Sequence, residues 1–273
     1  MTPYCEGWDS LSVDRDRLEK VAHHFLAPIS GKLIEPLVNL SEGYILDVAT
    51  GTGEPGITLA ETNPLLQVVG LDLSARMLTV AGKNAVRRNV PNYSVCQSDA
   101  GETPFEDERF HAIICRNGIM FFPDLAKALR EMHRLLKPGG SIHLCTWGQL
   151  SKNLWLDIVL TQVSAVTQAK VYRTFTPGMF YCMQPGFTTE WLDISGFRSI
   201  TEQELTGIVS FNSMEEYWDY VTTVSSAIVE ALRNLPPTSR EQVKRLVFDR
   251  LSTHIVNGRL YFQWTSNITT AFK

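Results

Sequence analysis

Between residues 44 and 147, short apolar runs alternate with longer amphipathic stretches, and this alternation is the strongest constraint on the fold. The runs have the length of strands and are rich in Val, Ile and Leu, as expected of parallel strands buried on both faces. They lie at 44–48, 67–72, 93–99, 111–117 and 141–147. Strands that alternate with helices in this way predict an α/β fold with a doubly wound sheet.

Local signals place the helices around these strands. Pro55 falls where a first helical turn would start, a position that tolerates proline. Ser74 is a suitable N-cap for the helix after the second strand, and the segment KPGG at 137–140 predicts a turn. On the N-terminal side we expect a helix over 14–26 and a short second one around 32–40, with a break at Pro36.

The alternation is lost after Trp147. Helices are predicted over 154–166, 188–194, 213–235 and 239–253, with strands near 197–205 and 261–272. We therefore expect an N-terminal helical lid over residues 1–40 and a ligand-binding core over 41–150. Residues 151–273 would supply helical insertions on the substrate side and the final strands of the same sheet.

Composition excludes several classes of function. The chain has 273 residues, a formal net charge of −4 and no run of Lys or Arg, so a nucleic-acid partner is not expected. The polar, acidic N-terminus is no signal peptide and no apolar stretch could span a bilayer, which indicates a cytoplasmic protein. The five scattered cysteines form no CxxC pair and predict free thiols, with no metal site. The oligomeric state, monomer or homodimer, stays open.

The segment DVATGTGEPGITLA contains glycines at 51, 53 and 56, a GxGxxG spacing that is often associated with dinucleotides. Two neighbours argue against a pyrophosphate. Asp47 brings a negative charge to the tip of the first strand, and Pro55 lacks an N–H where a phosphate needs donors. S-adenosylmethionine has no phosphate and carries two cationic groups that a carboxylate favours. We treat the third glycine, Gly56, as a coincidence of spacing within a helix.

Two further acids end the second and third strands. Asp72 suits a ribose diol, because both hydroxyls can donate to a carboxylate. Asp99 can accept a hydrogen bond from an adenine amino group. Since ligands of such sheets lie beyond the carboxyl ends of the strands, three acids there are more informative than the glycines alone.

Residues 40–147 resemble class I S-adenosylmethionine-dependent methyltransferases. The resemblance rests on the motifs DVATGTG, GLDLSARML, DAGETPF and LKPGG. It is greatest to the ubiquinone/menaquinone C-methyltransferase-like branch, the type 11 methyltransferases, which act on small molecules. One departure is His111, where the family usually has Asp at the start of the fourth strand. The resemblance implies a Rossmann-like sheet of seven strands whose last strand is antiparallel.

The resemblance also implies which residues bind S-adenosylmethionine and its product S-adenosylhomocysteine. The methionine end would be lined by the first loop and by the end of the fourth strand, at Asp47, Ala49, Gly51, Gly53, Arg116 and Asn117. The ribose and adenine would lie against the second and third strand ends, at Asp72, Leu73, Met77, Ser98, Asp99 and Ala100.

Methyl transfer requires alignment and exclusion of water, and a base only if the acceptor must lose a proton. His23 and His24 are the candidate bases. The acceptor pocket is expected to include Tyr4, Trp8, Met120, Phe121 and Trp147. Aromatic residues are frequent after position 148, which favours a small aromatic or apolar acceptor methylated on O, N or C.

Three alternatives stay open. An enzyme of this fold could bind the cofactor and catalyse another reaction, such as a cyclisation, because a fold does not fix a function. A non-catalytic binding subunit and an NAD dehydrogenase are less favoured by the three acids at the strand ends.

Overall fold

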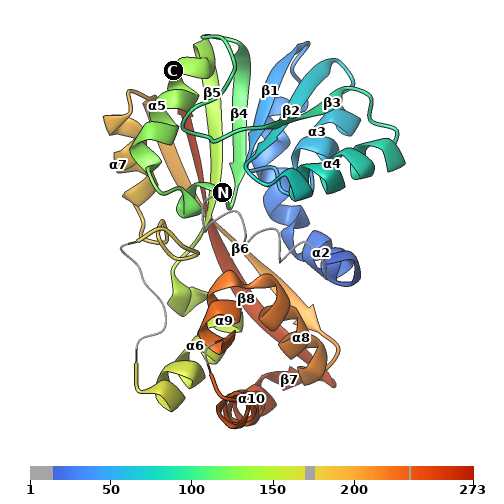
Figure 1. Cartoon of the computed structure of the whole chain (residues 1–273), viewed down its shortest axis with the longest axis vertical. Helices are drawn as coiled ribbons and strands as arrows, with labels where there is room; N and C mark the ends of the chain where they lie inside the picture. The colour runs from blue at the N-terminus through green and yellow to red at the C-terminus, as the bar shows by residue number, and fades with distance from the viewer. Residues whose placement is uncertain (1–14, 170–175, 234) are drawn as a thin grey trace.

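The computed structural model describes residues 15–169, 176–233 and 235–273, and its centre is a single mixed sheet (Figure 1). The strand order is β3-β2-β1-β4-β5-β8-β6, with a short eighth strand, β7, paired to β8. Every pairing from β3 to β5 is parallel, whereas β8 runs antiparallel to both β5 and β6. The predicted doubly wound α/β sheet with an antiparallel last strand is therefore confirmed.

The strands lie where the apolar runs predict them. Their bounds are β1 Gly43–Val48, β2 Leu66–Asp72, β3 Tyr93–Gln97, β4 Phe110–Arg116, β5 Leu136–Trp147, β6 Arg198–Phe211, β7 Ile255–Val256 and β8 Arg259–Phe272. The apolar residues of β1, β2, β4 and the second half of β5 are almost all buried, because helices cover the sheet on both sides.

The helices of the core follow the same order. The first is α2 (Arg15–Ile34), which packs on β4 and β5; α3 (Gly56–Thr62) and α4 (Ala75–Arg87) pack on β2 and β3; α5 (Leu125–Leu135) packs on β5. Three short 3-10 turns, η1 (Glu35–Leu37), η2 (Ile119–Phe121) and η3 (Leu150–Lys152), join elements of this region. This arrangement brings the ends of β1, β2 and β4 to one edge of the sheet.

The second half of the chain forms a helical lobe around the long β6–β8 pair, drawn below the sheet in Figure 1. It contains α6 (Leu154–Thr167), α8 (Met214–Val224), α9 (Ser226–Arg233), α10 (Pro237–Leu251) and η4 (Ser252–His254), while α7 (Phe187–Ile194) packs on β6 beside α5. None of the described helices has the length and hydropathy that a bilayer span requires.

Three elements differ from the predictions. The two helices expected before the sheet are one, α2, which continues past the exposed Pro28 because Phe25, Ile29 and Leu33 form a buried stripe on both sides of it. The single helix expected over 213–235 is divided in two. Ser225 adopts an extended conformation, and its Oγ accepts a hydrogen bond from the Ile228 N–H at 3.4 Å, which starts a new helix.

The third difference is the KPGG segment. It lies within β5 as an irregularity, because Leu136 pairs with Phe110 and the next paired residue is Ser141, opposite Ala112. Gly139 there has a φ of +75°, so the predicted turn signal marks a bulge and no strand boundary.

Candidate functional site

The loop after β1 presents two glycines at the carboxyl edge of the sheet. Gly51 and Gly53 have φ values of +57° and +106°, in the left-handed region that favours glycine. A Cβ on Gly53 would lie 2.3 Å from the Ile57 side chain, whereas one on Gly51 would meet nothing within 4 Å. Gly53 is therefore favoured by its backbone conformation and by the close Ile57 side chain, and Gly51 borders open space at the edge where a ligand is expected.

Four backbone N–H groups of this loop already have acceptors in the protein. The donors are Thr50, Gly51, Gly53 and Gly56. Their acceptors are the carbonyls of Leu71 and Thr50 and the carboxylates of Asp72 and Asp47, at 2.9–3.0 Å. A pyrophosphate would need these N–H groups as its own donors. The loop is therefore poorly suited to a dinucleotide.

Asp47, near the end of β1, is fully buried. Its Oδ2 accepts hydrogen bonds from Thr50 Oγ1 at 2.6 Å and from the Gly56 N–H at 3.0 Å. Its Oδ1 has no hydrogen-bond partner among the described residues. Burial raises the pKa of the carboxyl to about 7, against the lowering effects of Thr50, Arg116 and Gly56. A cationic ligand at this edge would favour the ionised carboxylate.

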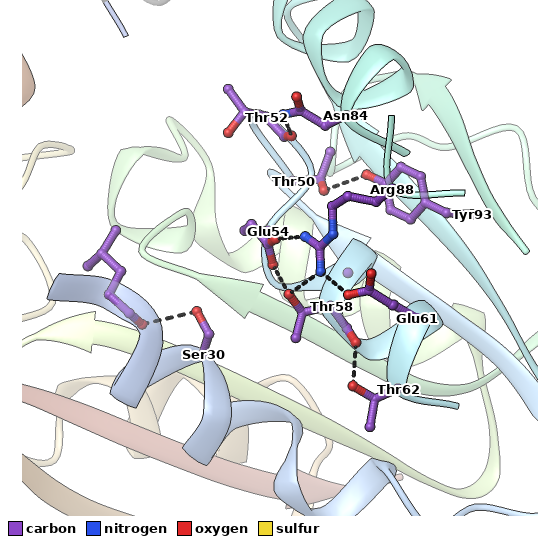
Figure 2. Close-up of polar contacts among 12 residues, drawn as sticks. Ser30, Thr50, Thr52, Glu54, Thr58, Glu61, Thr62, Asn84, Arg88 and Tyr93 are labelled. Carbon is purple, nitrogen blue, oxygen red and sulfur yellow. Dashed lines mark hydrogen bonds and ion pairs between the residues drawn. The ribbon is translucent and has the colours of Figure 1, made fainter. Parts of the chain in front are cut away.

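Gly56 is a required residue, so the expectation that its spacing is coincidental is wrong. A Cβ there would lie 2.6 Å from Asp47 Oδ2 and 3.0 Å from the ring of Tyr93. The hydroxyl of Tyr93 also lies 2.9 Å from Thr50 Oγ1 (Figure 2). The third glycine thus lets α3 begin directly against the Asp47 carboxylate, where a phosphate would sit in a dinucleotide enzyme.

Asp72 ends β2 and faces the same loop. Its two carboxylate oxygens accept hydrogen bonds from the Gly51 and Ser74 N–H groups, each at 2.9 Å. The side chain is half-buried, and Ser74 caps α4 as predicted by accepting a bond from the Met77 N–H at 3.1 Å. The carboxylate is thereby fixed next to Gly51 in a position that fits a ribose diol.

The residues expected around adenine lie at the ends of β2 and β3. Leu73 is 40% exposed and Met77 is buried in α4. Asp99 is exposed, and its Oδ1 accepts a hydrogen bond from the Gly101 N–H at 2.7 Å. The Ser98 hydroxyl donates to the Glu102 carbonyl at 2.8 Å, so it stabilises the turn that contains Asp99 and Ala100.

Arg116, at the end of β4, brings a positive charge close to Asp47. Its Nη1 donates to Ser30 Oγ on α2 at 2.6 Å. In the described ranges no carboxylate lies within ion-pair distance of it. Desolvation lowers the pKa of the guanidinium, and the charges of Glu54 and Asp47 raise it. Such a cation can bind an anionic group of a ligand, for example a carboxylate.

Two more predicted cofactor residues have unusual backbone conformations. Ala49 and Asn117 have φ values of +55° and +56°. The Asn117 N–H donates to the Cys145 carbonyl at 2.9 Å. A Cβ on Gly118 would lie 2.6 Å from the Cβ of Ala49. The chain therefore passes tightly between the ends of β1 and β4.

The residues expected to contact the acceptor are mostly packed into the protein. Met120 is 1% exposed, Trp147 is 6% exposed and Phe121 is half-buried. The ring of Trp147 lies 5.8 Å from that of Phe25 and 5.4 Å from that of Trp155. Trp147 thus belongs to an aromatic cluster that joins α2 to the helical lobe.

His23 and His24 lie in α2, but their side chains, like all of Tyr4 and Trp8, lie outside the described residues. The free thiols expected from the sequence are observed at the described cysteines, Cys96, Cys115, Cys145 and Cys182. In the part of the chain that the structure describes, no group of three or more His, Cys, Asp or Glu could hold a metal ion.

The sequence reasoning missed three residues of this site: Ser30, Thr50 and Tyr93. Thr50 lies inside the glycine motif, so its position three residues after Asp47 was a usable signal for a hydroxyl bond. Ser30 and Tyr93 reach the site from distant segments, through contacts 86 and 43 residues apart. Nothing in the local pattern marks either of them.

A family model described as a methyltransferase domain matches residues 40–179, just over half of the chain. The chain is 41% identical over 103 residues to a demethylmenaquinone methyltransferase of Chlorobaculum tepidum, covering 38% of this chain and 40% of the relative. It is 29% identical over 205 residues to a protein of the same name from Staphylococcus epidermidis, covering 74% and 80%. The match to the first of these relatives thus spans well under half of its length.

A solved structure from Bacillus halodurans, described as a methyltransferase, has the same fold. It aligns with a TM-score of 0.57 over 89% of this chain and 98% of its own, at 22% sequence identity. The likeness at this identity concerns the fold and does not extend to an acceptor.

Proposed function

The chain belongs to the methyltransferase domain family, and on that premise we propose that it transfers a methyl group from S-adenosylmethionine to a small aromatic acceptor. The observation that carries the proposal is the arrangement around the glycine loop. Four of its N–H groups are used within the protein, and a buried carboxylate oxygen of Asp47 is left unpaired. Both features disfavour a phosphate ligand and favour a cationic one.

The residues of the chain fit this cofactor. Asp72 would hold the ribose hydroxyls beside Gly51, and Asp99 would accept from the adenine amino group. Arg116 would bind the carboxylate of the methionine end, and the Asp47 charge would favour the cationic groups there. When bound, the cofactor supplies a methyl group already activated by a sulfonium.

The protein then has to align the acceptor and exclude water. The aromatic cluster of Phe25, Trp147 and Trp155 joins α2, the end of β5 and α6, and in this proposal it would close one side of the cofactor edge. Residues 1–40 would form a lid above it. His23 or His24 on α2 would take a proton if the acceptor has to lose one.

For the acceptor class we infer a hydroquinone-type ring with an apolar body. Support comes from the name of the relatives, demethylmenaquinone methyltransferase, and from the frequency of aromatic residues after position 148. The atom methylated, O, N or C, is left to the experiment.

The test is a transfer assay with methyl-labelled S-adenosylmethionine and three probes: a naphthohydroquinone with a short prenyl tail, a catechol and phosphoethanolamine. We expect labelled naphthohydroquinone and an equal amount of S-adenosylhomocysteine. Label only in phosphoethanolamine would refute the acceptor class. Conversion of a probe without S-adenosylhomocysteine would instead support another reaction of this fold, such as a cyclisation.

The His23→Ala and His24→Ala variants test the base. We expect one of them to lose turnover and to keep its affinity for the cofactor. Equal single-turnover rates for the wild type and both variants would remove these histidines from the mechanism.

A further inference from the structure

Two residues at the carboxyl end of α4, Asn84 in the helix and Arg88 at its C-cap, contact the glycine loop. Asn84 Nδ2 donates to the carbonyl of Thr52 at 2.9 Å. Four residues later, Arg88 forms an ion pair with Glu54 (Figure 2). The contacts are made to Thr52 and Glu54, the two neighbours of Gly53. They therefore hold the loop on both sides of the residue whose φ is +106°.

Arg88 is the centre of a larger network. Its guanidinium also pairs with Glu61 and donates to Thr58 Oγ1 at 3.1 Å, and Thr58 Oγ1 donates to Glu54 Oε2 at 2.6 Å. The side chains of Arg88 and Glu54 are only 26% and 16% exposed. A charge network with this shielding and several fixed bonds holds its geometry better than an exposed ion pair does.

The network ties the start of α3 to the end of α4. Asp72 and Ser74 connect the other end of α4 to the loop through the Gly51 N–H. The loop is therefore held at Gly51 by Asp72, just before α4, and at Thr52 and Glu54 by Asn84 and Arg88, near the other end of the helix. Glu54 is also one of the charges that act on Asp47 and Arg116, so its position affects the electrostatics of the site.

We propose that Asn84 and Arg88 are positioning residues for the cofactor, which hold the glycine loop in its binding conformation without touching the ligand edge. This inference rests on the proposed function, since it takes S-adenosylmethionine as the ligand. Pre-organisation of a loop increases affinity because less conformational freedom is lost on binding. Loss of the network should therefore weaken binding while the fold persists.

The test is calorimetric titration of S-adenosylmethionine and S-adenosylhomocysteine into the full chain. We expect about tenfold weaker binding in Arg88→Met and about threefold in Asn84→Ala. Arg88→Lys can still pair with one carboxylate and should recover part of the affinity. Arg87→Met, which removes an exposed charge from the same helix, is the matched control and should bind within about twofold of the wild type.

A second control separates loop positioning from general stability. Arg134 on α5 pairs with Glu131 and Asp107, so Arg134→Met removes a comparable network elsewhere. Hydrogen exchange of the peptide over 51–58 should be faster in ligand-free Arg88→Met than in Arg134→Met or the wild type, and the cofactor should restore protection.

Two results would overturn the inference. One is an unchanged affinity in both Arg88→Met and Asn84→Ala. The other is an equal loss of affinity in Arg134→Met, which would assign the effect to stability. If Arg88→Met fails to fold, the affinity of Asn84→Ala and its hydrogen exchange over 51–58 decide. Failure of the wild type to bind either ligand would instead refute the proposed function.

Discussion

The hydroxyl of Tyr93, on β3, lies 2.9 Å from Thr50 Oγ1 in the loop after β1. To reach it, the Tyr93 side chain crosses β2 at Gly70, where a Cβ would be 2.0 Å from the hydroxyl oxygen. Thr50 in turn donates to Asp47 at 2.6 Å. A buried chain of hydrogen bonds thus runs from β3 across β2 to the carboxylate of the site on β1.

Gly70→Ala should therefore destabilise the protein. The added methyl group would overlap the Tyr93 hydroxyl, and overpacking of a buried site costs about 1–3 kcal/mol. Urea denaturation should show this loss in the free energy of unfolding. The double variant Gly70→Ala/Tyr93→Phe lacks the Tyr93 hydroxyl oxygen, which is the atom nearest to the added methyl group. We therefore expect the effects of the two substitutions on the free energy of unfolding to be coupled by about 1 kcal/mol or more. Strict additivity would argue against the overlap.

The pKa of Asp47 predicts how cofactor binding depends on pH. The carboxyl has a pKa of about 7 in the folded protein, so it is mostly neutral below this pH. A cationic ligand prefers the ionised form, and binding should strengthen by up to about tenfold per pH unit below 7 and level off above it. Titrations of S-adenosylmethionine between pH 5.5 and 8.5 measure this. Asp47→Asn should remove the dependence and bind more weakly at pH 8.

The stability of the ligand-free protein should change in the opposite direction. The folded pKa of Asp47 lies above the ordinary value of 3.8, so the folded state binds more protons than the unfolded state between these values. Its contribution to the free energy of unfolding therefore decreases as the pH rises from about 4 to 7. Asp47→Asn should lack this gain in stability on acidification, which thermal unfolding over the same pH range measures.

How much of this site the sequence predicts depends on the range of the contact. The ends of β1 and β2, with Asp47 and Asp72, can be predicted from the apolar runs and the turn residues that follow them. The two acids are then expected to be close together, because the strand ends of a parallel sheet share one edge. The Ser74 cap is equally local. The role of Gly56 is not, since its missing side chain matters only once Tyr93 approaches from another strand.

The same limit applies to the helices. Pro28 and Pro36 carry similar local signals, yet α2 passes the first and ends before the second. The difference lies in tertiary packing, which buries Ile29 and Leu33 and so extends the helix over an exposed proline. A single sequence contains the stripe but does not show what it packs against.

Asp72→Ala should abolish measurable binding of S-adenosylmethionine and leave the sheet intact. The substitution would remove both the proposed ribose contact and the acceptor of the Gly51 and Ser74 N–H groups. Asp72→Asn keeps one acceptor oxygen and should retain part of the affinity. Calorimetry with far-UV circular dichroism as the folding control tests this. An unchanged affinity in Asp72→Ala would refute the ribose assignment.

Arg116→Met should weaken cofactor binding more than Ser30→Ala does. Arg116 supplies the charge proposed for the methionine carboxylate, whereas Ser30 Oγ only orients it, at 2.6 Å. We expect at least about tenfold for the first and about threefold for the second. Methylthioadenosine, which lacks that carboxylate, should bind the wild type and Arg116→Met alike. A loss for both ligands would place Arg116 elsewhere in the site.

His143 should give the free energy of unfolding a pH dependence opposite to that of Asp47, so variants of the two residues can separate their contributions. It is buried in β5, between Ser141 Oγ at 2.9 Å and Thr270 Oγ1 at 3.1 Å, and burial lowers its pKa from 6.5 to about 4. The unfolded state then binds more protons than the folded state between these values, so its contribution to stability is lost as the pH falls from about 6.5 to 4. In the wild type this loss is offset by Asp47. In Asp47→Asn the free energy of unfolding should decrease more steeply as the pH falls. In His143→Gln the free energy of unfolding should increase as the pH falls. Parallel profiles in the two variants would contradict both assignments.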